Sequence, residues 1–284
     1  MITKKSFNIK NEYGDNLVTD IKFAEDNLDK GKKNLPLVIF VHGFKGFKDW
    51  GGFPYMTDKL AEAGFFVVSF NFSYNGVGEK EDELVHFTRL ELFAKNTFSR
   101  ELDDLGNIID YFDDNRDNYN YDFGTLTLIG HSRGGGCVIL KTSQDKRVKK
   151  LITLAAVSHY DRYTERKKNE WKEKGFIEEP NSRTGQIMRM DISLLDDLET
   201  NKERLDIQEA MKRIDVPVLI LHGEQDLSVD YSNADTLHSL SNKELTEYKL
   251  IEKTGHTFGV VHPFDGTTKA FEKVIEESVK FIKN

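Results

Sequence analysis

The sequence predicts an α/β fold with a mostly parallel central sheet, helices on both faces and a helical cap insertion. Short apolar runs rich in β-branched residues alternate with segments whose apolar residues recur at helical spacing. The runs are continuous, as in strands covered on both faces, and the alternation extends through nearly the whole chain. The length of 284 residues suits one such domain, so we expect 1–284 to be a single domain.

The chain opens with two strands, 6–9 and 17–23, joined by a turn at Gly14-Asp15-Asn16, and a polar loop follows at 26–34. Further predicted strands are 37–41, 65–70, 126–129, 151–157, 216–221 and 248–251. Predicted helices are 55–63, 102–112, 134–142, 232–240 and 271–282.

Two charged segments, 74–98 and 158–215, interrupt this alternation, and their composition predicts mostly helix. Long excursions from a compact sheet are often functional, which favours a cap or lid at 158–215. Solvated surface helices are the alternative.

Composition narrows the class of protein. Lys and Arg total 40 against 48 Asp and Glu, and the net charge of -8 argues against binding to nucleic acid or an anionic membrane. The single cysteine excludes an intrachain disulfide and a Cys-rich zinc site. The longest apolar runs are far shorter than the ~20 residues of a membrane span, and no apolar stretch follows Lys4 and Lys5. We therefore expect a cytoplasmic protein, with a homodimer left open.

Gly130-His131-Ser132-Arg133-Gly134 fits the G-x-S-x-G pattern between a predicted strand and a predicted helix. A sharp strand-to-helix turn lifts the serine hydroxyl clear of the sheet, and glycines there avoid Cβ clashes. An incidental serine in a glycine-rich turn is the alternative, but the position of the motif favours Ser132 as a nucleophile.

A serine nucleophile needs a base, and His256 lies just past the strand 248–251, at the carboxyl edge of the sheet. His262 lies further from a strand end, and His238 falls in a predicted surface helix. We predict that His256 is the base.

The base needs a carboxylate to orient it, and Asp226 follows the strand 216–221. Glu224 is closer to the strand end, whereas Asp230 suits the start of the next helix. We predict Asp226, which gives the chain order Ser132, Asp226, His256 that serine hydrolases on such sheets use.

Acyl transfer also needs hydrogen-bond donors for the oxyanion. His42-Gly43-Phe44 follows the strand 37–41, so the backbone N–H groups of Phe44 and Arg133 are the predicted donors. We expect His42 and His131 to be structural. His222, Asp226 and His256 have metal-ligand side chains, but no H-E-x-x-H motif is present, and we expect neither metal nor cofactor.

With these motifs the chain resembles serine hydrolases of the α/β-hydrolase fold, from about residue 35 onward. It is most similar to bacterial cinnamoyl or feruloyl esterases and to dienelactone-hydrolase-like proteins. Dienelactone hydrolases proper use a cysteine nucleophile, whereas Ser132 stands here and Cys137 is expected to be buried. Arg133 replaces a side chain that is often uncharged in such esterases. It either pairs with a nearby Asp, which we favour, or meets a substrate carboxylate.

The resemblance implies a carboxylesterase that cleaves small to medium acyl or aryl esters through an acyl-enzyme. Tyr160, Tyr163 and Trp171 are candidates for lining the substrate pocket, with ordinary packing as the alternative. A peptidase or amidase on short peptides would use the same three residues. A non-catalytic ligand-binding protein is disfavoured because such proteins usually lack part of the triad.

Overall fold

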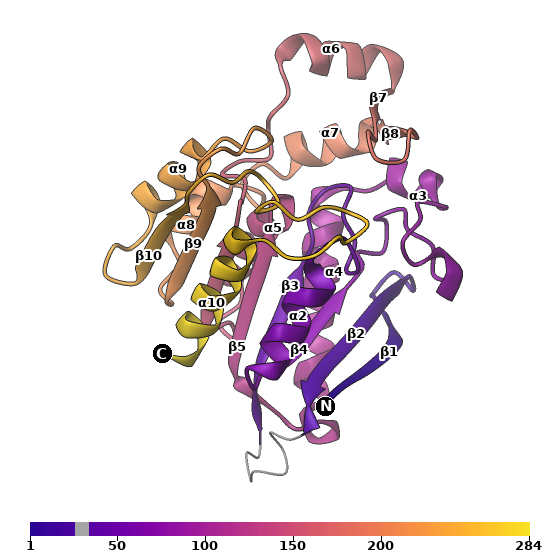
Figure 1. The fold of residues 1–284 in the computed structure, drawn as a ribbon. Coiled ribbons are helices and arrows are strands. Elements are labelled where there is room, and N and C mark those ends of the chain that lie inside the picture. Colours follow the sequence, from indigo (N-terminus) through magenta and orange to yellow (C-terminus); the bar gives the residue numbers. More distant parts are fainter. Residues whose placement is uncertain (26–33) are drawn as a thin grey trace.

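The computed structural model describes residues 1–25 and 34–284, and its main feature is one large twisted sheet (Figure 1). In these residues eight strands form the sheet in the order β1-β2-β4-β3-β5-β6-β9-β10. They are β1 Ile2–Lys10, β2 Asn16–Ala24, β3 Leu35–Val41, β4 Phe66–Phe70, β5 Tyr121–His131, β6 Lys150–Leu154, β9 Val218–Gly223 and β10 Thr246–Ile251. Of the loop predicted at 26–34, residues 26–33 lie outside the described residues.

The sheet is antiparallel where the chain begins and parallel elsewhere. β1 pairs with β2 and β2 with β4 in antiparallel register, whereas the pairs from β4 to β10 are parallel. β4 is fully buried and β3 is buried except at Pro36, as their continuous apolar sequence predicts. Because the six strands β4, β3, β5, β6, β9 and β10 are parallel, their carboxyl ends share one edge, where ligands bind in such sheets.

Helices cover both faces of this sheet, which confirms the predicted fold class. α2 (Phe53–Glu62) packs against α10 (Lys269–Lys283) on one face (Figure 1). On the other face α4 (Phe98–Asp114), α5 (Arg133–Gln144), α8 (Ile207–Lys212) and α9 (Ser232–Leu240) contact one another in that order. Thr268 caps α10 by accepting a hydrogen bond from the N–H of Phe271 at 3.0 Å.

The composition of the segment 74–98 predicts mostly helix, and this prediction was wrong. The segment holds only a short 3-10 turn at Glu81–Glu83 and the helix α3 at Leu90–Ala94. Its backbone is held by loop hydrogen bonds, such as that from the N–H of Arg89 to the carbonyl of Gly76 at 3.0 Å. Charged composition alone did not distinguish this loop from a solvated helix.

The insertion 158–215 is also not purely helical. It contains the helices α6 (Glu165–Lys174), α7 (Ile192–Thr200) and α8, and between α6 and α7 an antiparallel hairpin of β7 (Phe176–Pro180) and β8 (Ile187–Asp191). Gly175 ends α6 in the left-handed conformation with φ 77°. Alternate residues of the hairpin, Ile177, Met188 and Met190, are buried, which is strand and not helix periodicity.

The hairpin, α6 and α7 lie beyond the carboxyl edge of the sheet (Figure 1). α8, at the end of the insertion, belongs instead to the helical layer that packs on α5. That 158–215 moves as a lid stays a prediction. In the part of the chain that the structure describes, no helix combines the length and apolarity needed to cross a bilayer.

Candidate active site

Ser132 occupies a sharp turn between β5 and α5. Its backbone has φ 57° and ψ -119°, a strained conformation for a residue with a side chain. The turn tolerates only glycine around it: a Cβ on Gly130 would lie 2.4 Å from the carbonyl oxygen of Gly134, and one on Gly134 would lie 2.3 Å from that of His42. The motif therefore folds as the sequence predicts, with Ser132 projecting from the carboxyl edge of the sheet.

The structure brings Ser132, His256 and Asp226 together in one hydrogen-bonded chain. Nε2 of His256 lies 2.9 Å from Oγ of Ser132, and Nδ1 of His256 donates to Oδ2 of Asp226 at 2.7 Å. Asp226 follows β9 and His256 follows β10, and these two strands are parallel neighbours. Ser132 and Asp226 are 124 and 30 positions from His256 in the sequence, and all three residues thus meet at the same sheet edge.

Asp226 is buried and held from several sides. Its Oδ1 accepts hydrogen bonds from the N–H groups of Ser228 at 2.8 Å and Val229 at 2.9 Å. Burial by itself would raise the pKa of Asp226, but hydrogen bonds with His222 and His256 outweigh it and lower that pKa far below its usual value. The carboxylate therefore stays ionised beside His256.

His222 is a neighbour of Asp226 whose contact with that carboxylate was not predicted. Its Nε2 lies 3.3 Å from Oδ2 of Asp226 and 2.8 Å from the carbonyl oxygen of Val229, and its side chain is fully buried. A histidine four residues before the acid, at the end of the same strand, was the only pattern that pointed to it.

Two other buried histidines support the surrounding loops. His42 donates through Nδ1 to the carbonyl of Gly43 at 2.9 Å, and its Nε2 accepts from the N–H of Phe72 at 3.3 Å. His131 donates through Nε2 to the carbonyl of His256 at 3.0 Å. Burial lowers the pKa of His42 to about 4 and that of His131 to about 3, so both stay neutral at physiological pH.

The loop that carries Phe44 passes very close to the serine. A Cβ on Gly43 would lie 2.9 Å from Cβ of Ser132 and 3.5 Å from the backbone nitrogen of Arg133. Arg133 is the first residue of α5, so its N–H lacks an acceptor within the helix. The loop that carries Phe44 and the start of α5 with Arg133, which hold the two predicted oxyanion donors, therefore both lie next to Ser132.

The side chain of Arg133 pairs with Glu101 of α4, and not with the Asp that the sequence suggested. Its Nε donates to Oε2 of Glu101 at 2.9 Å, and its guanidinium lies 4.1 Å from the ring centroid of Phe98. Burial raises the pKa of Glu101, and the charge of Arg133 opposes this shift. Both side chains are more than nine-tenths buried.

The residues weighed as alternatives serve local structure. Glu224 accepts from the N–H of Lys253 at 3.2 Å, and Asp230 accepts from the N–H of Ser232 at 3.0 Å, next to the start of α9. Nδ1 of His262 accepts from the N–H of Gly51 at 2.9 Å. Cys137 is fully buried, and burial raises the pKa of its thiol.

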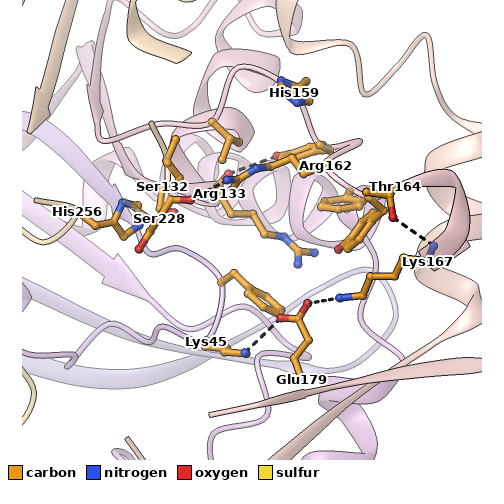
Figure 2. Close-up of a pocket in the computed structure, with 16 residues that line it drawn as sticks. Lys45, Ser132, Arg133, His159, Arg162, Thr164, Lys167, Glu179, Ser228 and His256 are labelled. Carbon is orange, nitrogen blue, oxygen red and sulfur yellow. Dashed lines mark hydrogen bonds and ion pairs between the residues drawn. The ribbon is translucent and has the colours of Figure 1, made fainter. Parts of the chain in front are cut away.

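A cavity of about 570 Å³ opens beside Ser132 and His256 (Figure 2). Its apolar wall combines two valines with four aromatic side chains: Val157, Val229, Phe44, Phe98, Tyr160 and Tyr163. Tyr160 stacks on Phe98 with the ring centroids 4.2 Å apart. A smaller cavity of about 120 Å³ also reaches Ser132 and His256 and is lined by Trp50, Phe53 and Arg183.

Trp171, the third aromatic residue predicted for the pocket, does not line this cavity. Its side chain is fully buried and packs edge-on against Tyr163 at 5.1 Å, so it supports the wall from behind. Lys45, Arg162, Lys167 and Glu179, which the sequence did not mark, line the cavity instead.

These features identify the class of protein. Residues 36–187 match the model of the alpha/beta hydrolase fold family, and the chain belongs to that family. Two curated relatives, each an uncharacterized 31.7 kDa protein in the traX-finO intergenic region of Escherichia coli, are 27% identical over 165 residues. That match covers 56% of this chain and 52% of the relative, about half of its length.

Solved structures with the same fold include esterases. Est1E from Butyrivibrio proteoclasticus with bound ferulic acid is 18% identical, with a TM-score of 0.70 over 98% of both chains. The esterase domain of a Rhodothermus marinus protein is 16% identical, with a TM-score of 0.63 over 99% of both chains. An esterase from Pyrobaculum calidifontis is 14% identical, with a TM-score of 0.66 over 99% of this chain and 84% of the other. Family membership and these neighbours support a hydrolase.

Proposed function

We propose that the protein is a carboxylesterase that cleaves small to medium acyl or aryl esters through a covalent acyl-enzyme. The observation that carries this proposal is the hydrogen-bonded chain from Ser132 through His256 to Asp226, beside a cavity of about 570 Å³ that Ser132 and His256 line. A cavity of that size suits a small organic molecule.

In the first half of the reaction, Oγ of Ser132 attacks the ester carbonyl carbon while Nε2 of His256 takes the hydroxyl proton. Asp226 holds the ring through Nδ1 and stabilises the imidazolium that forms. The tetrahedral intermediate collapses, the bond from the carbonyl carbon to the alkoxy oxygen breaks, and His256 gives its proton to the departing alcohol.

In the second half, His256 takes a proton from water, and the resulting hydroxide attacks the acyl carbon on Ser132. Collapse of this second intermediate releases the carboxylic acid and returns the proton to Ser132. The N–H groups of Phe44 and Arg133 stabilise the oxyanion in both halves, and one donor of this kind contributes ~3 kcal/mol.

Labelling with a fluorophosphonate, followed by peptide mass spectrometry, tests the nucleophile. We expect the label on Ser132 of the native protein, and neither label nor ester hydrolysis in Ser132→Ala, which removes one oxygen and leaves the fold intact. Labelling at another serine, or a Ser132→Ala variant with near-native rates, would contradict the proposal.

A substrate panel tests which kind of bond the protein cleaves. We expect hydrolysis of p-nitrophenyl esters and no hydrolysis of aminoacyl anilides. The reverse preference would make the protein a peptidase or amidase. A correctly folded protein that neither takes the label nor cleaves any compound would instead be a ligand-binding protein.

A further inference from the structure

The cavity beside Ser132 is basic, although the protein as a whole is acidic. Four cationic side chains line it, Lys45, Arg133, Arg162 and Lys167, against the single carboxylate of Glu179. The chain as a whole has a net charge of -8. A concave site whose charge opposes that of the whole molecule concentrates ligands of the opposite sign, here anions.

The acidic partners do not neutralise this set. Glu179 lies between two lysines, 2.9 Å from Nζ of Lys167 and 3.4 Å from Nζ of Lys45, so one carboxylate serves two ammonium groups. Glu101 compensates Arg133. Arg162 has no carboxylate partner among the described residues, and its guanidinium donates only to the carbonyl of Ser228 at 2.7 Å.

One donor in this wall lacks an acceptor. Nη2 of Arg133 is buried and has no hydrogen-bond partner in the described part of the chain, while Nε of the same guanidinium is held by Glu101. A buried donor without an acceptor is destabilising, and an oxygen of a bound ligand would supply the missing hydrogen bond. The stack on Phe98 fixes the plane of this guanidinium, so it is pre-positioned for such an oxygen.

Two of the cationic groups, those of Arg133 and Lys167, are separated from the nucleophile along the cavity, whereas Arg162 donates to the carbonyl of Ser228, near Ser132 and His256. Figure 2 shows Ser132 and His256 at one end of the residues drawn, Thr164 and Lys167 at the other, and the Arg133 guanidinium between them. An ester bond at Ser132 therefore leaves the rest of the molecule to run past aromatic rings towards cationic groups.

From this arrangement we propose that the preferred substrates are esters with a carboxylate several bonds from the ester group, such as half-esters of medium-length dicarboxylic acids. This inference rests on the proposed esterase activity and specifies its substrate class. The aromatic wall covers the apolar middle of the molecule, Arg133 and Lys167 face its charged end, and Arg162 adds to the positive charge of the cavity.

The test compares two compounds that differ in charge and not in shape, monomethyl adipate and its uncharged amide, methyl adipamate. Release of acid is followed in a pH-stat near neutral pH. We expect kcat/KM to be about tenfold higher for the anion, and this ratio to shrink when salt is raised from about 0.02 M to about 0.5 M. A methyl aminohexanoate, which carries a positive charge, should be the poorest of the three.

Variants test whether the preference for the anionic ester comes from the cationic side chains of the cavity. Arg162→Gln and Lys167→Gln should each lower the anion-to-amide ratio about fivefold. Arg213→Gln is the matched control, because Arg213 is exposed next to α8 and does not line the cavity, and it should leave the ratio unchanged.

The result can separate this inference from the proposed function. A wild-type ratio of one or less, or a ratio that neither variant changes, overturns the inference while hydrolysis of both esters upholds the esterase. Loss of all hydrolysis together with absent fluorophosphonate labelling would overturn the proposed function itself.

Discussion

Oδ2 of Asp226 lies 2.7 Å from Nδ1 of His256, and the other carboxylate oxygen is held by two backbone N–H groups. The carboxylate therefore cannot turn away, and it fixes which ring nitrogen faces Ser132. An amide at this position would keep the shape but favour the wrong tautomer of the ring.

Asp226→Asn should lower kcat by about ten-thousand-fold with little change in KM, because it removes the charge that stabilises the imidazolium. Steady-state kinetics on a p-nitrophenyl ester measures the loss. Asp230→Asn is the control, since that side chain serves the backbone near α9, and its kcat should stay near the native value. Similar losses in both variants would contradict the role of Asp226.

Gly43→Ala should lower kcat about a hundredfold, because the new Cβ would meet Cβ of Ser132 and the carbonyl oxygen of His131, each at 2.9 Å. The Phe44 loop must then move, and a displaced oxyanion donor costs ~3 kcal/mol. Gly106→Ala is the control, because its Cβ would approach only the flexible end of Lys141. A Gly43→Ala variant with native kcat would show that Phe44 is not a donor.

Stability should rise as the pH is raised from about 4 to about 7. The pKa of His42 is lowered to about 4 and that of His131 to about 3 by burial, so in this window the unfolded chain binds protons that the folded chain does not. Urea unfolding at pH ~5 and pH ~7 measures the difference in free energy. His131→Gln should reduce that difference, and a difference that stays the same would contradict the assignment.

Arg183→Ala should lower kcat for uncharged esters about three- to tenfold, the range of one lost hydrogen bond. Nη2 of Arg183, in the turn between β7 and β8, donates to the carbonyl of Lys45 at 2.5 Å, next to Phe44. Lys45 has φ 54°, so this bond helps to hold a strained residue directly after Phe44, the predicted oxyanion donor.

Arg189→Ala is the matched control for Arg183, since Arg189 lies on the same hairpin but, among the described residues, pairs only with Asp191 and the ring of Phe176. A positioning role predicts that Arg183→Ala changes kcat more than KM and weakens a transition-state analogue such as a boronic acid. If both variants behave alike, the effect belongs to the hairpin as a whole.

The strand ends were predictable from the sequence, and with them the meeting of Ser132, Asp226 and His256. Continuous apolar runs mark buried parallel strands, and such strands end at one edge, so residues just past them become neighbours. The partner of Arg133 was not predictable, because Glu101 lies 32 residues away on a helix whose rotation about its axis depends on packing. For the same reason neither Lys45 nor Glu179 stood out.

The insertion was the least predictable part. Its charged composition resembles that of a solvated helix, whereas the β7–β8 hairpin depends on three buried residues in alternation and on the turn after Asn181. The position of Trp171 behind the cavity wall follows from packing against Tyr163, which no local pattern encodes.

Lys45 links the loop that carries Phe44 to the insertion 158–215. Its carbonyl accepts from Arg183, its ammonium contacts Glu179 and the carbonyl of Pro180, and it directly follows Phe44. A graft that replaced residues 158–215 with the corresponding segment of a related hydrolase, in order to change selectivity, would remove all three contacts. Turnover and selectivity should therefore change together in such chimaeras, and a transplanted segment will need its own means of anchoring this lysine.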